Sequence, residues 1–347
     1  MKRGKIIIID IVILCFIIGS IDLTDVIARK KTKYLWKFGT VMPDAAFLSE
    51  YMKNDLIACF EKATNGELTM DIYWGGIMGD EEDYITKMRI DQLQGCSLSV
   101  GGVLMACPEM GVVQLPFLFN NYNEVEYIRR KLYSRFVEIY KNSGLKMLIW
   151  IDQDFDQIYS TKYEMRKPED FKRSRFLTHA GTIEIELIKA LGGSPIPVGV
   201  PEVVPSFRAG VCNSVISPAL WWMGSQLYTM TKYVNPYPFR YSPATLVVSN
   251  KAWSRLPDKY RVAIDRELPR LEKFMNNMAH KMNRDCLRAM INYGLIEVKM
   301  TPEEIDVFRE RTKPMWDNLA GKLYPKKLLE EIKYHLRIYR DKHTKKG

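Results

Sequence analysis

The 347 residues include only four histidines, and none of them lies in a His-Glu-x-x-His motif or near a Gly-x-Ser-x-Gly motif. A Cys/His or Ser/His hydrolase is therefore disfavoured, because its nucleophile needs an imidazole as its base. The glycine-rich Gly-x-Gly-x-x-Gly and P-loop signatures are also missing, which argues against dinucleotide and nucleoside-triphosphate binding. We expect no enzymatic activity and no cofactor.

The six cysteines include no Cys-x-x-Cys pair. Five remain if an N-terminal leader is removed, so buried single thiols are expected rather than a disulfide framework or a metal site. Lysine and arginine number 51 against 41 aspartates and glutamates, a net charge of +10. This charge suits an acidic partner, but homeodomain, zinc-finger and RNP motifs are absent, so no nucleic-acid partner is expected.

The N-terminus has the pattern of a signal peptide. Lys2, Arg3 and Lys5 precede an apolar stretch over residues 6–19 that only Asp10 interrupts. This stretch is short for a membrane span and fits a signal-peptide core. Residues 26–28 offer a small-residue cleavage site, so residues 1–28 are expected to direct export to the periplasm. An uncleaved membrane anchor stays as the alternative.

The remaining sequence alternates between strand-like and helix-like patterns, which favours an α/β fold with a mainly parallel sheet. Strands are expected at 34–41, 67–74, 97–103, 147–160, 173–178, 211–217 and 245–250, and helices at 45–63, 81–90 and 183–191. A helical period also runs over residues 258–293, about 54 Å at the usual rise. We expect one helix that spans two domains, kinked at Pro269; two separate helices are the alternative.

Five motifs follow one another between residues 37 and 308. They are FEKATNGE (60–67), PEMGVVQLPFLF (108–119), KPEDFK (167–172), KALGG (189–193) and LVVSNKAWSRLP (246–257). In this order and spacing the chain resembles the solute-binding proteins of tripartite ATP-independent periplasmic (TRAP) transporters, of the DctP type. The resemblance implies two α/β lobes with a hinge cleft, two crossovers and a long helix that braces both lobes.

The resemblance also predicts the division of the chain and its partners. Lobe I is expected at 34–155 plus about 245–285, lobe II at 156–244 plus about 286–325, and a basic helix or tail at 326–347. The implied partners are a small-molecule ligand and the TRAP membrane permease subunits. Some systems of the family add a periplasmic tetratricopeptide-repeat protein.

The ligand site departs from the family at its usual arginine. Family members bind carboxylates through an arginine in the strand after the Pro-Glu-Asp motif, because a guanidinium donates two parallel hydrogen bonds. An ungapped count places that position at Leu177. Arg175 lies about 6.6 Å away on the same strand face and would serve only if the register slips.

Two further family positions change in the same direction. A second arginine position falls near Asp156, and the family's Gln-Glu-Asn trio becomes Val215, Ile216 and Ser217. An unpaired buried carboxylate would cost several kcal/mol, whereas apolar contact contributes about 25 cal/mol per Å². We therefore expect an apolar or amphipathic ligand with one polar end near His179, Ser217 or Gln153.

The expected ligand-binding residues are Trp74, Gly101, Phe117, Gln153, Phe155, Leu177, His179, Val215, Ser217, Trp221, Trp222, Phe239 and Tyr241. No metal ligand is assigned. Three alternatives stay open: each aromatic residue belongs to a lobe core, the protein binds a small organic acid through Arg175, or the cleft is degenerate and the protein serves signalling or interaction.

The C-terminus from residue 324 is basic and carries an apolar stripe of Leu328, Leu329, Ile332, Leu336 and Tyr339. Such a stripe could lie on an anionic membrane or on the permease. The alternative is a terminal helix that packs on a lobe and exposes only its charged face.

Overall fold

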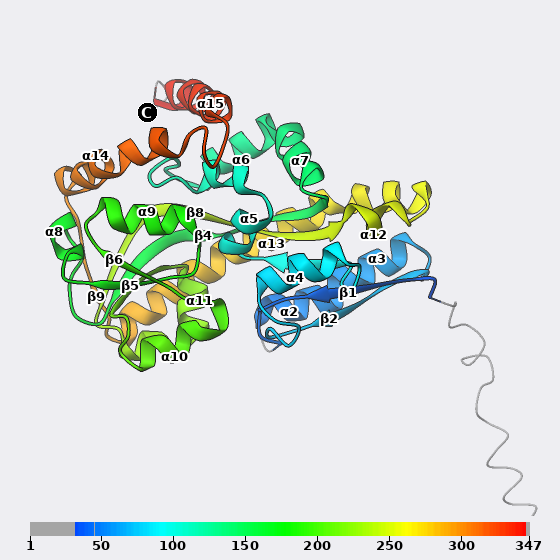
Figure 1. Cartoon of the computed structure of the whole chain (residues 1–347), viewed down its shortest axis with the longest axis horizontal. Helices are drawn as coiled ribbons and strands as arrows, with labels where there is room; N and C mark the ends of the chain where they lie inside the picture. Colours follow the sequence, from blue (N-terminus) through cyan, green and yellow to red (C-terminus); the bar gives the residue numbers. More distant parts are fainter. Residues whose placement is uncertain (1–31, 45, 345–347) are drawn as a thin grey trace, which may run out of the picture.

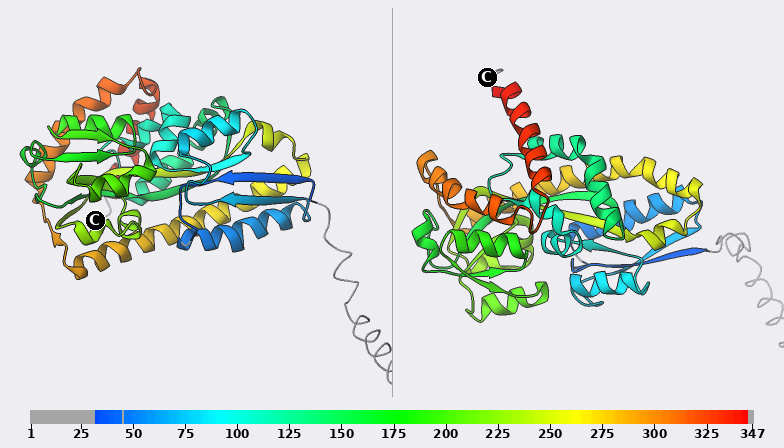
Figure 2. Two further views of the ribbon diagram at one scale, coloured as in Figure 1. Left: turned by 60° about the horizontal axis from the view of Figure 1, so that its bottom comes forward. Right: turned by 45° about the horizontal axis from the view of Figure 1, so that its top comes forward.

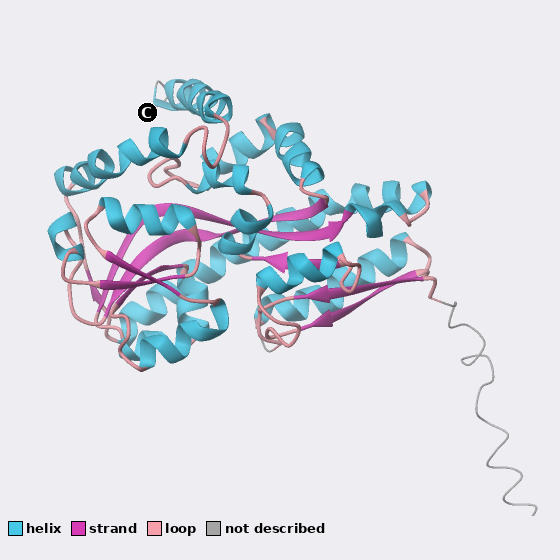
Figure 3. Ribbon diagram, in the orientation of Figure 1, coloured by secondary structure: helices cyan, strands magenta, loops and turns pink. Residues whose placement is uncertain are grey.

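The computed structural model describes residues 32–44 and 46–344 and contains a mixed sheet of nine strands (Figures 1 and 3). The strands are β1 (Tyr34–Gly39), β2 (Leu68–Tyr73), β3 (Gly95–Leu98), β4 (Leu145–Ser160), β5 (Arg175–Thr178), β6 (Ser194–Pro197), β7 (Ser214–Ser217), β8 (Tyr233–Ser249) and β9 (Ile296–Glu297). Their order is β2-β1-β3-β8-β4-β7-β5-β6, with β9 beside β8. The predicted signal peptide lies outside the described residues.

Two long antiparallel strands, β4 and β8, run through the middle of the sheet. On one side β1 pairs in parallel with β2 and β3, and on the other β5 pairs in parallel with β6 and β7. The contacts of β3 with β8 and of β4 with β7 are antiparallel, so the sheet is mixed rather than mainly parallel. Each parallel group forms one lobe, and β4 and β8 connect them. The residue at which one lobe ends stays a prediction.

Helices cover both faces of the sheet (Figure 1). The N-terminal lobe carries α2 (Phe47–Tyr51), the π-helical η2 (Met52–Leu56), α3 (Ile57–Ala63), α4 (Glu81–Arg89), α5 (Val100–Ala106), η3 (Pro108–Gln114), α6 (Tyr122–Lys131), α7 (Tyr133–Asn142) and α12 (Asn250–Ser254). The second lobe carries α8 (Pro168–Phe171), α9 (Thr182–Ala190), η4 (Val200–Glu202), α10 (Val203–Arg208), α11 (Ala219–Gly224), η5 (Leu227–Met230) and α14 (Pro302–Leu319).

The long helix predicted from its period is confirmed as α13 (Asp258–Tyr293). It is one helix of 36 residues, with Pro269 in its interior, rather than two. It packs on β4, on α3 of one lobe and on α11 of the other, and Figure 2 shows it running along both lobes. Because it touches both, it can limit how the lobes move relative to each other.

Two predicted elements were wrong in extent. The strand expected at 97–103 ends at Leu98, and Val100 begins α5. The cause is tertiary, since the buried Glu81 carboxylate accepts hydrogen bonds from the backbone N–H and hydroxyl of Ser99 and so turns the chain. The strand expected at 245–250 is the end of β8, which begins at Tyr233.

The C-terminal helix α15 (Lys326–Thr344) packs on α6. Leu328, Leu329, Ile332 and Leu336 are fully buried. The predicted apolar stripe therefore faces the protein, which agrees with the interpretation of a terminal helix packed on a lobe and not with a stripe that contacts a membrane or the permease. None of the helices within the described ranges is long and apolar enough to cross a membrane.

Candidate functional site

The two lobes touch where α5 meets the turn between β5 and α9. A Cβ atom built on Gly101 would lie 2.5 Å from the carbonyl oxygen of His179. Gly181 in the same turn has a φ of +80° and leaves room for Leu104 of α5, which would lie 2.9 Å from its Cβ. Glycine is needed at position 101 because a side chain would meet the backbone of the other lobe, and at position 181 because the positive φ strains any other residue.

A hydrogen bond joins the lobes at a second point. The Asp80 carboxylate, just before α4, accepts from the backbone N–H of Val200 at 3.2 Å. The Gln153 side chain on β4 accepts weakly from Val100 N–H at 3.4 Å, at the start of α5. The segments that follow β3 and β5 are thus in contact over the middle of the sheet. The two lobes are therefore closed against each other.

A buried ion pair lies beneath this contact. Arg240 on β8 donates from Nε to Asp156 on β4 at 2.8 Å, and Ser242 also donates to that carboxylate. Arg240 Nη2 lies 3.8 Å from Glu184 Oε1 on α9. Glu184 in turn accepts from the backbone N–H groups of His179 and Ala180. This group links β4, β8 and the β5–α9 turn.

Several polar atoms of this group have no hydrogen-bond partner among the described residues. They are Arg240 Nη1, Asp156 Oδ1, Glu184 Oε1, His179 Nδ1 and Thr178 Oγ1, with Gln114 Oε1 nearby on η3. All are inaccessible, and the Gln114 amide also donates to the Val100 carbonyl beside Gly101. Unpaired buried polar atoms are rare in native proteins, so their concentration at a lobe interface points to a ligand.

Burial governs the charges at this site. It raises the pKa of both Asp156 and Glu184, although Arg240 opposes each shift. Burial, together with repulsion by Arg240, lowers the pKa of His179 to about 4. The imidazole is therefore neutral at pH 7, and it stacks on the partly exposed Trp221 ring with 5.5 Å between centroids.

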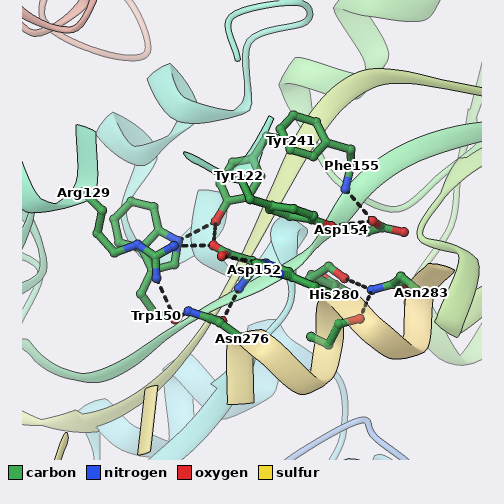
Figure 4. Close-up of polar contacts among 12 residues, drawn as sticks. Tyr122, Arg129, Trp150, Asp152, Asp154, Phe155, Tyr241, Asn276, His280 and Asn283 are labelled. Carbon is green, nitrogen blue, oxygen red and sulfur yellow. Dashed lines mark hydrogen bonds and ion pairs between the residues drawn. The ribbon is translucent and has the colours of Figure 1, made fainter. Parts of the chain in front are cut away.

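A second polar network holds the β4 crossing (Figure 4). Asp152 binds Arg129 of α6, His280 of α13 and the Tyr241 hydroxyl of β8. Burial alone would raise the pKa of Asp152, but these partners lower it. Because α6 and α13 both hold β4 here, the network makes this part of the strand rigid.

The neighbouring Asp154 connects the network to the second lobe. It accepts from the Tyr122 hydroxyl at 2.7 Å and from Ala219 N–H, at the start of α11, at 3.2 Å. Burial raises the pKa of Asp154 to about 6. Tyr122 also stacks on His280 with 3.5 Å between ring centroids. Asp154 therefore ties α11 to helix α6 at the hinge.

Of the predicted ligand residues, four come together at the lobe contact: Gly101, Gln153, His179 and Trp221. Ser217 is buried and ends β7 just before α11. Leu177, Val215 and Trp222 are fully buried in the core of the second lobe. Phe155, Phe239 and Tyr241 belong to the largest core, with Phe117 packed against it. Trp74 instead borders a separate groove of about 420 Å³ along β2.

Arg175 does not enter the cleft. It is exposed at the first residue of β5, and its guanidinium donates to the carbonyls of Val211 and Gly210. The register slip that would bring Arg175 to the Leu177 position is therefore wrong. Its side chain stabilises a surface turn instead.

Sequence reasoning missed Arg240, Glu184 and Thr178. Arg240 is the lone arginine of segment 233–249, which forms β8 but whose prolines kept most of it from being predicted as a strand. Asp156 is likewise one of three aspartates in the apolar segment 145–160. A buried charge in one strand requires a partner in another, but Arg240 lay outside the predicted strands, so the two were not paired. No cluster of residues that could hold a metal ion occurs in ranges 32–44 and 46–344.

Comparison with known proteins agrees with this architecture. Residues 38–322 match the family described as bacterial extracellular solute-binding protein, family 7. A solute-binding protein of Chromohalobacter salexigens is 23% identical over 58% of this chain and 60% of its own length. The C4-dicarboxylate-binding periplasmic protein of Rhodobacter capsulatus is 21% identical over 76% of this chain and 80% of its own.

A solved structure has the same fold. The sugar acid binding protein of Advenella mimigardefordensis, crystallised with galactonate, has a TM-score of 0.81 and 19% identity. The superposition covers 88% of this chain and 99% of that one. The predicted two-lobe α/β fold is thereby confirmed.

Proposed function

Because the chain belongs to family 7 of the bacterial extracellular solute-binding proteins, we propose that it captures a small solute outside the cytoplasm for a TRAP-type transporter. The observation that carries this proposal is the closed lobe contact, with unpaired buried polar atoms of Arg240, Asp156 and Glu184 beneath it. A protein of this kind binds and releases, and it performs no chemistry on its solute.

The mechanism follows from the connections between the lobes. Within the described residues, β4, β8 and α13 run through both lobes, and the chain crosses again between α14 and α15, so opening would turn one lobe against the other about these connections. Opening would separate Gly101 from His179 and expose the Arg240 group to solvent. Closure would then bury the solute, and the closed outer surface would be the form that membrane permease subunits recognise.

The solute is proposed to have a polar end that binds the buried group of Arg240, Asp156 and Glu184. Trp222, Phe239 and Tyr241, which the sequence suggested as apolar walls, lie in the lobe cores. Trp221 stays partly exposed beside His179 and offers one apolar face. An amphipathic solute is therefore the second candidate, with its apolar part on Trp221. A wholly apolar solute would leave Arg240 Nη1 buried without an acceptor.

The export signal predicted at residues 1–28 supports a periplasmic site of action. The TRAP permease subunits are the proposed partners. A periplasmic tetratricopeptide-repeat protein, which some TRAP systems use, is a further proposed partner. A signalling role without transport would need the same closure but no permease.

The test is a bulky residue at the lobe contact. Gly101→Leu places a side chain against the His179 backbone, which cannot retreat like a flexible side chain, so the lobes cannot close. We expect the wild type to gain thermal stability with a bound solute, as mass action requires, and Gly101→Leu to gain little or none. A thermal-shift screen of organic acids, amino acids, sugars and fatty acids supplies the measurement.

The matched control is Gly224→Ala, at an exposed position with no atom within 4 Å of the added Cβ. This variant should respond to the solute like the wild type. Equal solute responses in Gly101→Leu and the wild type would contradict binding between the lobes.

A further inference from the structure

We propose that the solute is a zwitterion, whose carboxylate binds Arg240 and whose ammonium group lies between Asp156 and Glu184. This inference rests on the proposed function and specifies the chemical class of its solute. It also separates this chain from the relative crystallised with galactonate, a sugar acid.

The charge count of the buried group leads to this class. Arg240 is its one cation, and its side chain is 1% exposed. Asp156 and Glu184 are both wholly buried and both approach Nη2 of that guanidinium, Asp156 within hydrogen-bond distance and Glu184 at 3.8 Å. With both carboxylates ionised, the group carries one excess negative charge, and burial opposes that charge by raising the pKa of both carboxylates. Buried charge is stable only when it is paired, so the excess calls for a cation from the solute.

The unpaired atoms specify both ends of the solute. Arg240 uses Nε and Nη2 on Asp156, which leaves Nη1 as a buried donor without an acceptor. Asp156 Oδ1 and Glu184 Oε1 are buried acceptors without donors. A carboxylate satisfies the donor, and an ammonium group, with three N–H donors, satisfies the two acceptors.

A solute that is only an anion would fit poorly. It would satisfy Arg240 but add a second excess negative charge beside Asp156 and Glu184. His179 cannot offset this charge, because its low pKa keeps it neutral. Asp80 at the same lobe contact adds a further carboxylate. The partly exposed Trp221 ring, in contrast, is a favourable neighbour for a cation.

The test compares matched compounds on the full wild-type chain by calorimetric titration. Each set contains an amino acid, the 2-hydroxy acid with the same side chain and the amine that lacks the carboxylate. The sets cover glycine, leucine and phenylalanine, and galactonate is measured alongside. We expect one or more amino acids to bind, and each loss of the amine or carboxylate to weaken binding by about 30-fold or more.

The outcomes separate the two proposals. The zwitterion proposal is overturned if a 2-hydroxy acid binds as tightly as the matching amino acid, or if galactonate binds as tightly as the best amino acid. It is also overturned if compounds bind but none of them is an amino acid. In each case the proposed function still stands. If no compound in these sets binds, the zwitterion is overturned. If the broader thermal-shift screen also finds no solute, the proposed function falls with it.

The variant Glu184→Gln tests the position of the ammonium group. The amide keeps an oxygen for the His179 and Ala180 N–H groups, so the turn should stay folded. We expect amino-acid affinity to fall about tenfold and the preference over the 2-hydroxy acid to shrink. Glu186→Gln, on the same helix but partly exposed and paired with Lys189, should change neither. Unchanged selectivity in Glu184→Gln would contradict the assignment.

Discussion

At the scale of single residues, the buried Glu81 carboxylate makes the stability of the fold depend on pH. It is fully buried and accepts hydrogen bonds from the backbone and hydroxyl of Ser99, where β3 turns into α5. Burial raises its pKa to about 7. The folded chain therefore binds a proton more tightly than the unfolded chain at this position.

The sign of the effect on stability follows from proton linkage. Because the folded-state pKa is raised, the stabilisation is fully present below about pH 4.5 and is lost as pH rises to about 7. The expected loss is about 3 kcal/mol from this group. Urea unfolding of wild type and Glu81→Gln at pH 5 and pH 8 measures it. Glu81→Gln should lose less stability between the two pH values, and an equal loss in both proteins would contradict the prediction.

The site residues were only partly predictable from the sequence. Gly101, Gln153, His179 and Trp221 were expected in the cleft and do meet at the lobe contact. The replacement of the family's arginine by Leu177 stays a prediction, and the sequence analysis did not pair Arg240 with Asp156. Those two residues are 84 positions apart and become neighbours only through the pairing of β4 with β8.

At the scale of elements, α15 makes a prediction about packing. Leu329 is fully buried in the contact of α15 with α6, whereas Ile338 on the same helix is 41% exposed. Leu329→Ala should lower the free energy of unfolding by about 2–5 kcal/mol, because it leaves a cavity. Ile338→Ala should change it by less than about 0.5 kcal/mol. Urea denaturation compares the two, and equal small effects would mean that α15 is not docked.

The spacing of apolar residues predicted the long helix of this chain better than it predicted the strands. The apolar period over residues 258–293 predicted α13 with the bounds that the structure has. Most of β8 was not predicted as a strand, because Pro236, Pro238 and Pro243 interrupt its sequence. In this stretch β8 pairs with β4 alone, since β9 and β3 pair only with its two ends. Prolines are tolerated on such an open edge, which a sequence pattern cannot reveal.

At the scale of the molecule, the sheet order explains how one chain makes two lobes. In the sheet formed by the described residues, the parallel groups β2-β1-β3 and β7-β5-β6 are joined through β4 and β8, and α13 lies along both. The polar network of Asp152, Arg129 and His280 holds β4 at the crossing, and Asp154 links that point to α11. Motion between the lobes is therefore expected to be a hinge rather than a loosening of the fold.

Small-angle X-ray scattering of the full chain, with and without the solute that most raises its thermal stability, tests the hinge most directly. The radius of gyration of the wild type should fall on saturation, because the lobes close at Gly101 and His179. The radius of gyration of Gly101→Leu should stay at the larger, solute-free value. A wild type that binds its solute with no change in radius of gyration, or a Gly101→Leu variant that contracts equally, would contradict capture by closure of the two lobes.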